Sequence, residues 1–257
     1  WQYVPLNLIP WRLGVPLILL VLLVWWNRLA RQTLEVSNRM LVGLVMIGIA
    51  LQLGVQFTGT YGFSNLDRTL DWWYYGYFWP ATRVDDLRHF LSIYAEQQPA
   101  SFMDYSPPPV SGFGNFFSRV STHPPGFLIY YWLILQGVKH APVLPELART
   151  IILAHSGSMG WLNIYTPDEI LAGLVGGLGV TAIGSLAVVP LYKLGVAAYG
   201  PDTARRAAIL YLLAPSLTLF TPVADQLLTL VSALLLWLTY TGFVRQSRPR
   251  LALAGLA

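Results

Sequence analysis

Four aspartates and four basic side chains between residues 67 and 123 have the chemistry needed to move a group from a phosphate to a hydroxyl. The acidic candidates for taking the hydroxyl proton are Asp67, Asp71, Asp85 and Asp86. A partly desolvated aspartate is a stronger base, which suits that role. The basic candidates for neutralising phosphate charge are Arg83, Arg88, Arg119 and His123. Each of these residues alone is more often a solvated loop charge, and it is their grouping that favours a site.

The run Ser121-Thr122-His123-Pro124-Pro125-Gly126 leads directly into an apolar stretch that ends at Val138. Two prolines suit a first helical turn, and Thr122 is the expected N-cap. The helix N-terminus beside His123 would attract an anion such as a phosphate. About a dozen residues are too few to cross a hydrocarbon core, which needs roughly 20, so an interfacial helix is expected. An ordinary helix start, with His123 as an interfacial polar residue, explains the run equally well.

The composition indicates an integral membrane protein. Of 257 residues, 55% are apolar and 11% are charged, and this charged fraction is about half that of an ordinary soluble domain. The expected spans are Leu13 to Trp26 with an N-terminal extension through Leu8, Met40 to Thr58, Ile170 to Leu191, Ala207 to Val223 and Leu227 to Phe243. The absence of cysteine excludes disulfides and thiolate metal sites. The chain begins at Trp1 and ends inside an apolar run, so we expect it to be part of a longer protein.

Three basic clusters predict the topology. They are Arg28, Arg31 and Arg39; Lys193, Arg205 and Arg206; and Arg245, Arg248 and Arg250. Because these cations lie beside the spans, the net charge of +4 does not indicate nucleic-acid binding. The positive-inside rule places all three clusters in the cytoplasm if the helix from Gly126 to Val138 does not span.

The predicted fold is therefore an all-α polytopic transmembrane protein with a long extracytoplasmic loop that carries interfacial helices. Residues 1–39 form a first transmembrane helix and a basic cytoplasmic loop, and residues 40–59 a second helix. Residues 60–169 form the loop, which is long enough to suggest a function. Residues 170–257 contain the remaining transmembrane helices.

Aromatic residues fill seven of the eight positions from Trp72 to Trp79. Such a run is typical of an aromatic belt at the lipid headgroups, but it could also stack on sugar rings or hold a polyprenyl chain. Residues 97–117 are rich in proline and glycine and predict irregular backbone, either a surface loop or a lid.

Polar and small residues also mark the predicted spans. Asp225 lies between two of them and is expected to cap a helix, to face a polar site on the outer side, or both. The glycines between Gly173 and Gly184 are expected to allow close helix packing.

The order of these motifs resembles the GT-C class of membrane glycosyltransferases, in particular the protein O-mannosyltransferase and aminoarabinose transferase-like branch. The resemblance covers roughly Met40 to Phe243. Its motifs are the acidic and Tyr-containing loop, Thr122-His-Pro-Pro-Gly126, Pro190-Leu-Tyr-Lys-Leu-Gly195, the segment Ala204 to Pro215, and Phe220-Thr-Pro-Val-Ala-Asp225.

The resemblance implies an enzyme that takes a sugar from a polyprenyl-phosphate carrier at the extracytoplasmic face of a bacterial or archaeal plasma membrane. It implies Asp71, four residues before Tyr75, as the base, with Asp67 as the second choice. Asp71 is followed by Trp72 where the family has Glu. His123 would border the site. A direct displacement with inversion is expected, with basic groups holding the departing phosphate, with or without a divalent metal.

Two other classes of protein remain open. One is a noncatalytic GT-C-like scaffold subunit of a larger membrane complex, with which the missing Asp-Glu pair is compatible. The other is a transporter, which would be expected to carry polar or charged residues near mid-membrane. The predicted spans contain almost none.

Overall fold

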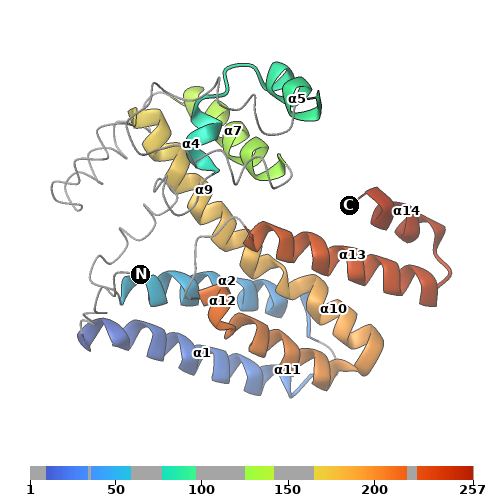
Figure 1. Cartoon of the computed structure of the whole chain (residues 1–257). Helices are drawn as coiled ribbons and strands as arrows, with labels where there is room; N and C mark the ends of the chain where they lie inside the picture. The colour runs from blue at the N-terminus through green and yellow to red at the C-terminus, as the bar shows by residue number, and fades with distance from the viewer. Residues whose placement is uncertain are drawn as a thin grey trace. The chain divides into compact units, whose positions relative to one another are not determined.

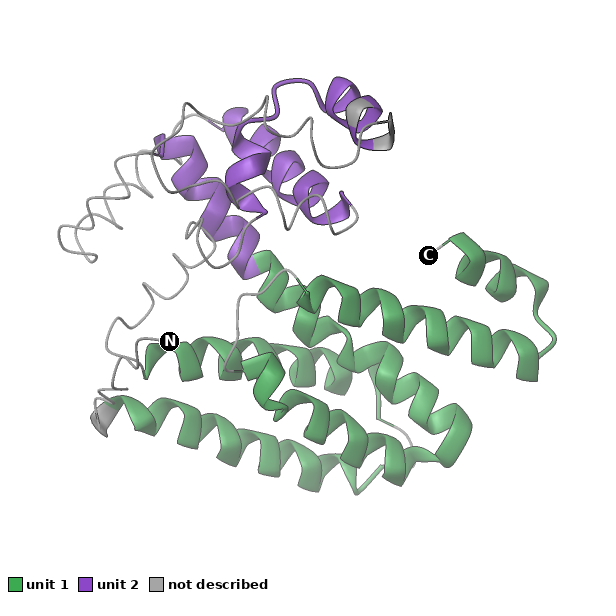
Figure 2. Cartoon of the chain, in the orientation of Figure 1, with its two compact units in different colours: residues 1–65, 179–257 green, residues 66–178 purple. Residues whose placement is uncertain are grey.

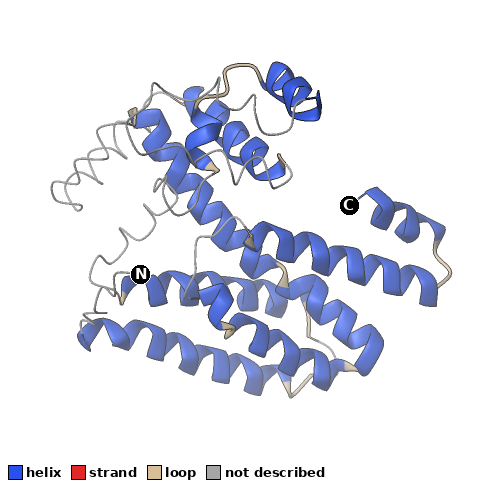
Figure 3. Cartoon of the chain, viewed as in Figure 1, coloured by secondary structure: helices blue, strands red, loops and turns tan. Residues whose placement is uncertain are grey.

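A computed structural model of the chain describes residues 10–33, 36–58, 77–96, 125–141, 165–218 and 225–256. Every regular element in these ranges is a helix, which confirms the all-helical prediction for the described residues (Figures 1 and 3). The helices are η1 (Pro10–Leu13), α1 (Gly14–Ala30), α2 (Asn38–Phe57), α4 (Phe78–Thr82), α5 (Leu87–Glu96), α7 (Gly126–Lys139), α9 (Pro167–Leu186), α10 (Val188–Tyr199), α11 (Pro201–Leu212), α12 (Pro215–Thr218), α13 (Gln226–Val244) and α14 (Arg248–Leu256).

Three helical stretches are long and apolar enough to cross a membrane: Asn38–Phe57, Pro167–Tyr199 and Gln226–Val244. They coincide with three of the five predicted spans. α1 coincides with a fourth, but its 17 residues fall short of the roughly 20 that a hydrocarbon core requires.

The predicted span from Ala207 to Val223 is wrong as one continuous helix. α11 begins earlier, at Pro201, and ends at Leu212, and the short α12 begins at Pro215. Pro215 has no backbone N–H and disfavours helical geometry in the residue before it, so the helix cannot continue through this point. Residues 219–224 lie outside the described ranges.

The chain divides into two compact units (Figure 2). Unit 1 comprises residues 1–65 and 179–257, and unit 2 comprises residues 66–178. Most of the predicted loop, residues 60–169, falls in unit 2. Helix α9 belongs to unit 2 up to Leu178 and to unit 1 from Gly179.

Unit 1 is a helical bundle in which α1 with α2, and α10 with α11, form antiparallel pairs. Near the turn between α1 and α2, the Trp26 Nε1 donates to the Met40 carbonyl at 2.8 Å. The core between these helices and α10 and α11 is mostly aliphatic. Its buried members are Leu23, Trp26, Ala30, Leu41, Leu44, Val188, Tyr192, Ala204, Ala208, Leu212 and Leu217.

Glycines allow several of these helices to approach closely. A Cβ on Gly195 of α10 would lie 2.9 Å from both Cα and Cβ of Ala204 in α11. A Cβ on Gly184 of α9 would lie 3.2 Å from the Leu217 side chain. In unit 2, a Cβ on Gly176 would lie 2.6 Å from the Tyr131 ring. The packing role predicted for the α9 glycines is thus confirmed at Gly176 and Gly184.

Candidate functional site

The predicted site residues fall into three groups. Asp67, Asp71, Arg119 and His123 lie outside the described residues, as does the irregular segment 97–117. The second group, Arg83, Asp85, Asp86 and Arg88, lies in unit 2 at the connection between α4 and α5. Asp225 lies in unit 1. Among the described residues, four of the predicted site residues are therefore close together in the chain. Asp225 belongs to the other unit.

Arg83 has an unusual environment within this cluster. It lies at the C-terminus of α4, where its guanidinium carbon is 4.1 Å from the ring centroid of Trp79, one helical turn earlier. Its Nε is buried without a hydrogen-bond partner, and the structure gives Arg83 no ion pair with any described carboxylate. A cation stacked on an indole keeps its N–H donors available. An unsatisfied buried donor of this kind is suited to an anionic group.

Aromatic packing fixes the backbone on both sides of Arg83. Phe78 is buried in edge contact with Tyr131 of α7, with 5.6 Å between ring centroids. Trp79 makes an edge contact with Tyr165 at 5.4 Å. After Arg83, the Val84 carbonyl accepts a hydrogen bond of 2.8 Å from the indole of Trp132.

Tyr77 and Phe78 are thus core residues of unit 2, since both are buried. Tyr77 makes a second edge contact with Phe127, at 5.0 Å. The aromatic run was predicted to be a membrane belt or a sugar-stacking surface, and both predictions are wrong for these two side chains. Trp79 is half-buried and keeps part of its surface exposed. Residues 72–76 lie outside the described residues.

Asp86 has a structural role that the sequence analysis did not assign. Its Oδ1 accepts hydrogen bonds from the backbone N–H groups of Arg88 at 2.8 Å and His89 at 3.2 Å. This is an N-cap of α5. Asp85 and Arg88 are exposed. A role for these three residues in substrate binding stays a prediction.

The predicted Pro-Pro helix is present as α7, Gly126–Lys139. Its N-cap position is Pro125, without a side-chain cap, so the prediction of Thr122 as the N-cap is wrong. The Pro125 carbonyl accepts the first helical bond, from Ile129 at 2.9 Å. The helix therefore begins one residue after the second proline, and residues 121–124 lie outside the described ranges.

Two tyrosines of α7 anchor it to the first part of α9. Tyr130 donates its hydroxyl to the Gly176 carbonyl at 2.9 Å, and the neighbouring Tyr131 ring packs on Gly176. Burial raises the pKa of Tyr130 to about 12. The pKa of Tyr131 is raised further, mainly by burial and secondarily by electrostatic repulsion from the Tyr130 phenolate when both titrate. Both phenols are therefore protonated at neutral pH. Sequence reasoning missed this pair because Gly176 is distant along the chain.

Asp225 occupies the N-cap position of α13 but makes no side-chain capping hydrogen bond, and it is exposed. The capping prediction is therefore wrong. The turn is held instead by the next residue, Gln226, whose buried Nε2 donates to the Leu217 carbonyl at 2.9 Å. A site role for Asp225 remains a prediction.

A seam of buried amide and hydroxyl groups lies near the Gln226 turn in unit 1. Gln52 of α2 donates to Ser185 Oγ at 2.7 Å and to the Thr181 carbonyl at 3.3 Å. One turn later, Gln56 donates to the Thr218 carbonyl at 3.3 Å. All five residues are buried. The spans were expected to contain almost no polar residues, although two glutamines one turn apart on α2 are a sequence signal of a polar helix contact.

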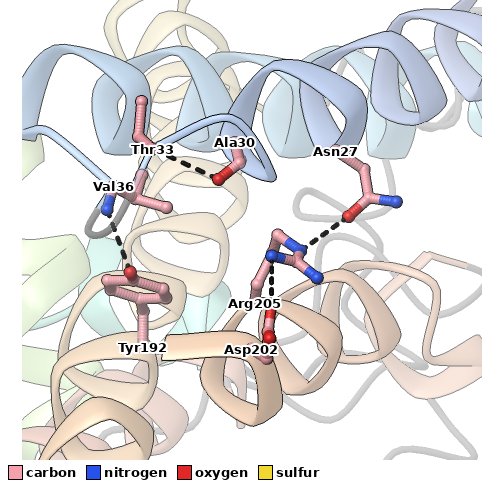
Figure 4. Close-up of polar contacts among 7 residues, drawn as sticks. All are labelled: Asn27, Ala30, Thr33, Val36, Tyr192, Asp202 and Arg205. Carbon is pink, nitrogen blue, oxygen red and sulfur yellow. Dashed lines mark hydrogen bonds and ion pairs between the residues drawn. The ribbon is translucent and has the colours of Figure 1, made fainter. Parts of the chain in front are cut away.

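Hydrogen bonds also join the helices of unit 1 where the first two basic clusters lie (Figure 4). The buried Arg205 donates from Nε to Asn27 Oδ1 at 2.9 Å and pairs with Asp202 at 2.7 Å. The Val36 N–H donates to the Tyr192 hydroxyl at 3.1 Å. These contacts place the α1–α2 turn beside the α10–α11 turn.

α13 reaches the same end of unit 1. A Cβ on Gly184 would lie 3.4 Å from the Gln226 side chain, and Lys193 Nζ lies 5.1 Å from the Trp237 ring. α13 therefore runs parallel to α9 and α10. We call residues 27–33, 36–40, 192–206 and 237–250 the basic end of unit 1, and the part of unit 1 around Gln56, Thr218 and Asp225 its opposite end.

The described residues contain no group of three His, Cys, Asp or Glu side chains placed to hold a metal ion. Asp67, Asp71 and His123 are outside that search. No family model, curated protein or solved structure matches the chain. The resemblance to GT-C enzymes accordingly rests on the order and spacing of its motifs.

Proposed function

We propose that the chain is an integral membrane glycosyltransferase that moves a sugar from a polyprenyl-phosphate donor to an acceptor hydroxyl. In this proposal α2, α9 with α10, and α13 cross a bacterial or archaeal plasma membrane, and the chain returns across it through α11 and α12, between α10 and α13. Two features of unit 1 support membrane insertion. Large apolar side chains such as Leu17, Ile18 and Val21 are more than half exposed. In addition, nine of its ten described cations, all except Arg12, lie at the basic end, as the positive-inside rule requires.

The same rule assigns the active face. With the basic end in the cytoplasm, the opposite end of unit 1 faces outward. α2 ends at this opposite end, since Gln56 contacts Thr218 there. The chain re-enters unit 1 at Gly179, next to Thr181, which contacts Gln52 on the last turns of α2. Both connections to unit 2 therefore start from the outward end, so the proposed extracytoplasmic segment is unit 2.

Arg83 is the observation that carries the choice of a phosphate-linked donor. Its guanidinium is stacked on Trp79, has a buried Nε without a partner and has no described carboxylate as counter-ion. A phosphate oxygen bound to the half-buried guanidinium would neutralise this charge. The rigid aromatic packing around Trp79 would hold the guanidinium in place, which lowers the entropic cost of binding.

The proposed reaction is a single displacement. The carboxylate of Asp71, with Asp67 as the alternative, takes the proton of the acceptor hydroxyl. The acceptor oxygen then bonds to the anomeric carbon while the bond from that carbon to the phosphate oxygen breaks, which inverts the carbon. The polyprenyl phosphate leaves with the bonding electron pair. Arg83 stabilises the charge that develops on the phosphate.

Transfer assays on the full chain in proteoliposomes test both roles. Asp71→Asn should lower kcat by about 10²- to 10⁴-fold if Asp71 is the base. If Asp67 is the base, Asp67→Asn should have this effect instead. Arg83→Gln should lower kcat/KM by at least about tenfold, because a hydrogen bond to a charged group contributes about 1.5–3 kcal/mol. Lys139→Gln removes an exposed cation of unit 2 and serves as the matched control. Full activity in both aspartate variants would overturn the base assignment, and unchanged kcat/KM in Arg83→Gln would overturn the phosphate role.

The sidedness is tested by thiol labelling, because the chain has no cysteine. Lys139→Cys in unit 2 and Thr203→Cys at the basic end both introduce a thiol at an exposed position. A membrane-impermeant maleimide should label the first in intact cells and the second only after the membrane is opened. The reverse pattern would refute the proposed orientation.

A noncatalytic scaffold subunit is the second candidate function. This candidate is favoured because residues that were predicted to contact the substrate have structural roles. Asp86 caps α5, and Tyr77 and Phe78 fill the core of unit 2. A scaffold would show no transfer with any polyprenyl-phosphate sugar, while co-purifying in fixed ratio with other membrane subunits.

A further inference from the structure

We infer that the basic end of unit 1 binds the phosphate headgroups of anionic phospholipids. Six of its arginines are exposed: Arg28, Arg31, Arg39, Arg206, Arg245 and Arg248. Asp202 is the only acidic residue described at this end, and its carboxylate is already paired with the buried Arg205. The exposed arginines therefore form a surface with no described counter-charge of its own.

The choice of cation favours phosphate as the ligand. Lys193 is the single lysine of the three clusters, and it lies over the Trp237 ring. The other members are all arginine. A guanidinium presents paired N–H donors that match two phosphate oxygens, whereas an ammonium acts as a point charge.

Exposed aromatic and aliphatic side chains lie next to these arginines. Trp25 is 57% exposed and precedes Arg28 by one turn, and Phe243 and Val244 are 68% and 64% exposed just before Arg245. Tyr199, at the end of α10, is 77% exposed. Exposed tryptophan and tyrosine between an apolar surface and a basic one are typical of the membrane interface. A nucleic acid or an acidic protein would leave this apolar surface in water, so the pattern favours lipid.

The surface is also held together before any lipid binds. Arg205 joins α11 to Asn27 of α1, and Tyr192 of α10 accepts from Val36 in the α1–α2 turn. The arginines of α1, α2 and α11 are thus carried by one linked set of helix ends. Lipid headgroups can therefore bridge these arginines without the free-energy cost of rearranging the backbone.

The inference rests on the membrane insertion proposed above, but it does not depend on sugar transfer. The test uses the full chain, delipidated in an uncharged detergent and mixed with micelles that contain equal amounts of phosphatidylglycerol and phosphatidylcholine. Lipids retained by the protein are counted by mass spectrometry of the intact complexes. We expect the wild type to retain phosphatidylglycerol preferentially, and this preference to weaken as salt screens the charges.

Arg31→Gln with Arg245→Gln should lower the preference about 25-fold, since each surface cation contributes a factor of about five. Lys139→Gln removes an exposed cation of unit 2 and should leave the preference unchanged, whereas Arg31→Gln alone should lower it about fivefold. An equal loss in Lys139→Gln and Arg31→Gln, or no preference in the wild type, would overturn the inference. The lipid measurement contains no sugar donor, so its result does not depend on whether the chain transfers sugar. If the chain transfers sugar but shows no preference for phosphatidylglycerol, only the inference about lipid binding is refuted.

Discussion

The two units hold their helices together by different means. In unit 2, large aromatic side chains are buried, as Phe78 and Tyr131 show, and ring edges make the contacts between α4 and α7. In unit 1, many large apolar side chains are exposed, and several contacts between helices use glycine or an amide. Gly195 meets Ala204, and Gln52 meets Ser185.

This difference indicates different surroundings for the two units. Burial of large apolar groups stabilises a fold in water. In lipid, apolar burial gives no advantage, and close packing of small residues and hydrogen bonds between helices replace it. Unit 1 follows the second pattern more closely and unit 2 the first, as expected if unit 1 lies in lipid and unit 2 in water. Variants in the two units should therefore respond differently.

Phe78→Ala should have the largest effect, a loss of about 3–5 kcal/mol confined to unit 2. The cause is the cavity left among Tyr131, Tyr165 and the α4 backbone. Thiols introduced by Ala81→Cys in unit 2 and Ala208→Cys in unit 1, both at buried positions, report the opening of each unit by their labelling rates. Faster labelling at position 81 alone supports the contrast, whereas equal acceleration at both positions would show that the units unfold as one.

Gly195→Ala should destabilise unit 1 by about 1–3 kcal/mol, because overpacking forces adjustments in the core. The new methyl would meet the backbone of Ala204 at 2.9 Å, and a backbone cannot rotate away. Gly43→Ala is the control, since nothing lies within 4 Å of its Cβ position and the change should stabilise α2 slightly. Thermal unfolding in detergent measures both, and equal melting temperatures would refute close packing at Gly195.

Tyr130→Phe should cost about 1 kcal/mol at neutral pH through loss of the hydrogen bond to Gly176. The same tyrosine predicts a pH dependence, because burial raises its pKa from 10.0 to about 12. Below pH 10 the phenol is protonated whether the chain is folded or unfolded. Between pH 10 and 12 the unfolded state loses the proton first, so stability falls as pH rises through this window. Denaturant unfolding across this window should show a smaller decline in Tyr130→Phe than in the wild type.

The hydrogen bond between Gln52 and Ser185 should have a coupling energy near 0.6 kcal/mol, the average for such bonds between membrane helices. A double-mutant cycle with Gln52→Ala and Ser185→Ala isolates it from the separate packing effects. A coupling of several kcal/mol would mean that the seam is more than a helix contact, and would favour a polar function inside unit 1.

Much of the helical framework could be predicted from sequence, because apolar runs of the right length are a strong local signal. α13 was expected from Leu227 to Phe243 and extends from Gln226 to Val244. The break before Pro215 was missed because the apolar character continues past it, although proline chemistry was sufficient to locate it. The N-cap at Asp86 could also have been predicted from sequence, because an aspartate directly precedes the amphipathic α5.

The environment of the candidate site was less accessible to sequence reasoning. Arg83 was one of four basic residues predicted to neutralise phosphate charge, and its spacing of four from Trp79 could have suggested the stacking. The inward orientation of Tyr77 and Phe78 depends on Phe127 and Tyr131, about fifty positions later, so no local pattern could separate core from surface.

The smallest expected effect is that of Asp225→Ala, which should leave stability nearly unchanged. Asp86→Ala is its matched control and should cost about 1 kcal/mol, because Asp86 caps its helix. Asp225 holds the same position at α13 without a capping bond. Denaturant unfolding compares the two variants, and a loss of similar size in Asp225→Ala would show a structural role. If stability is unchanged while sugar transfer falls, Asp225 must act through its exposed carboxylate, and unit 1 then contributes chemistry as well as a membrane bundle.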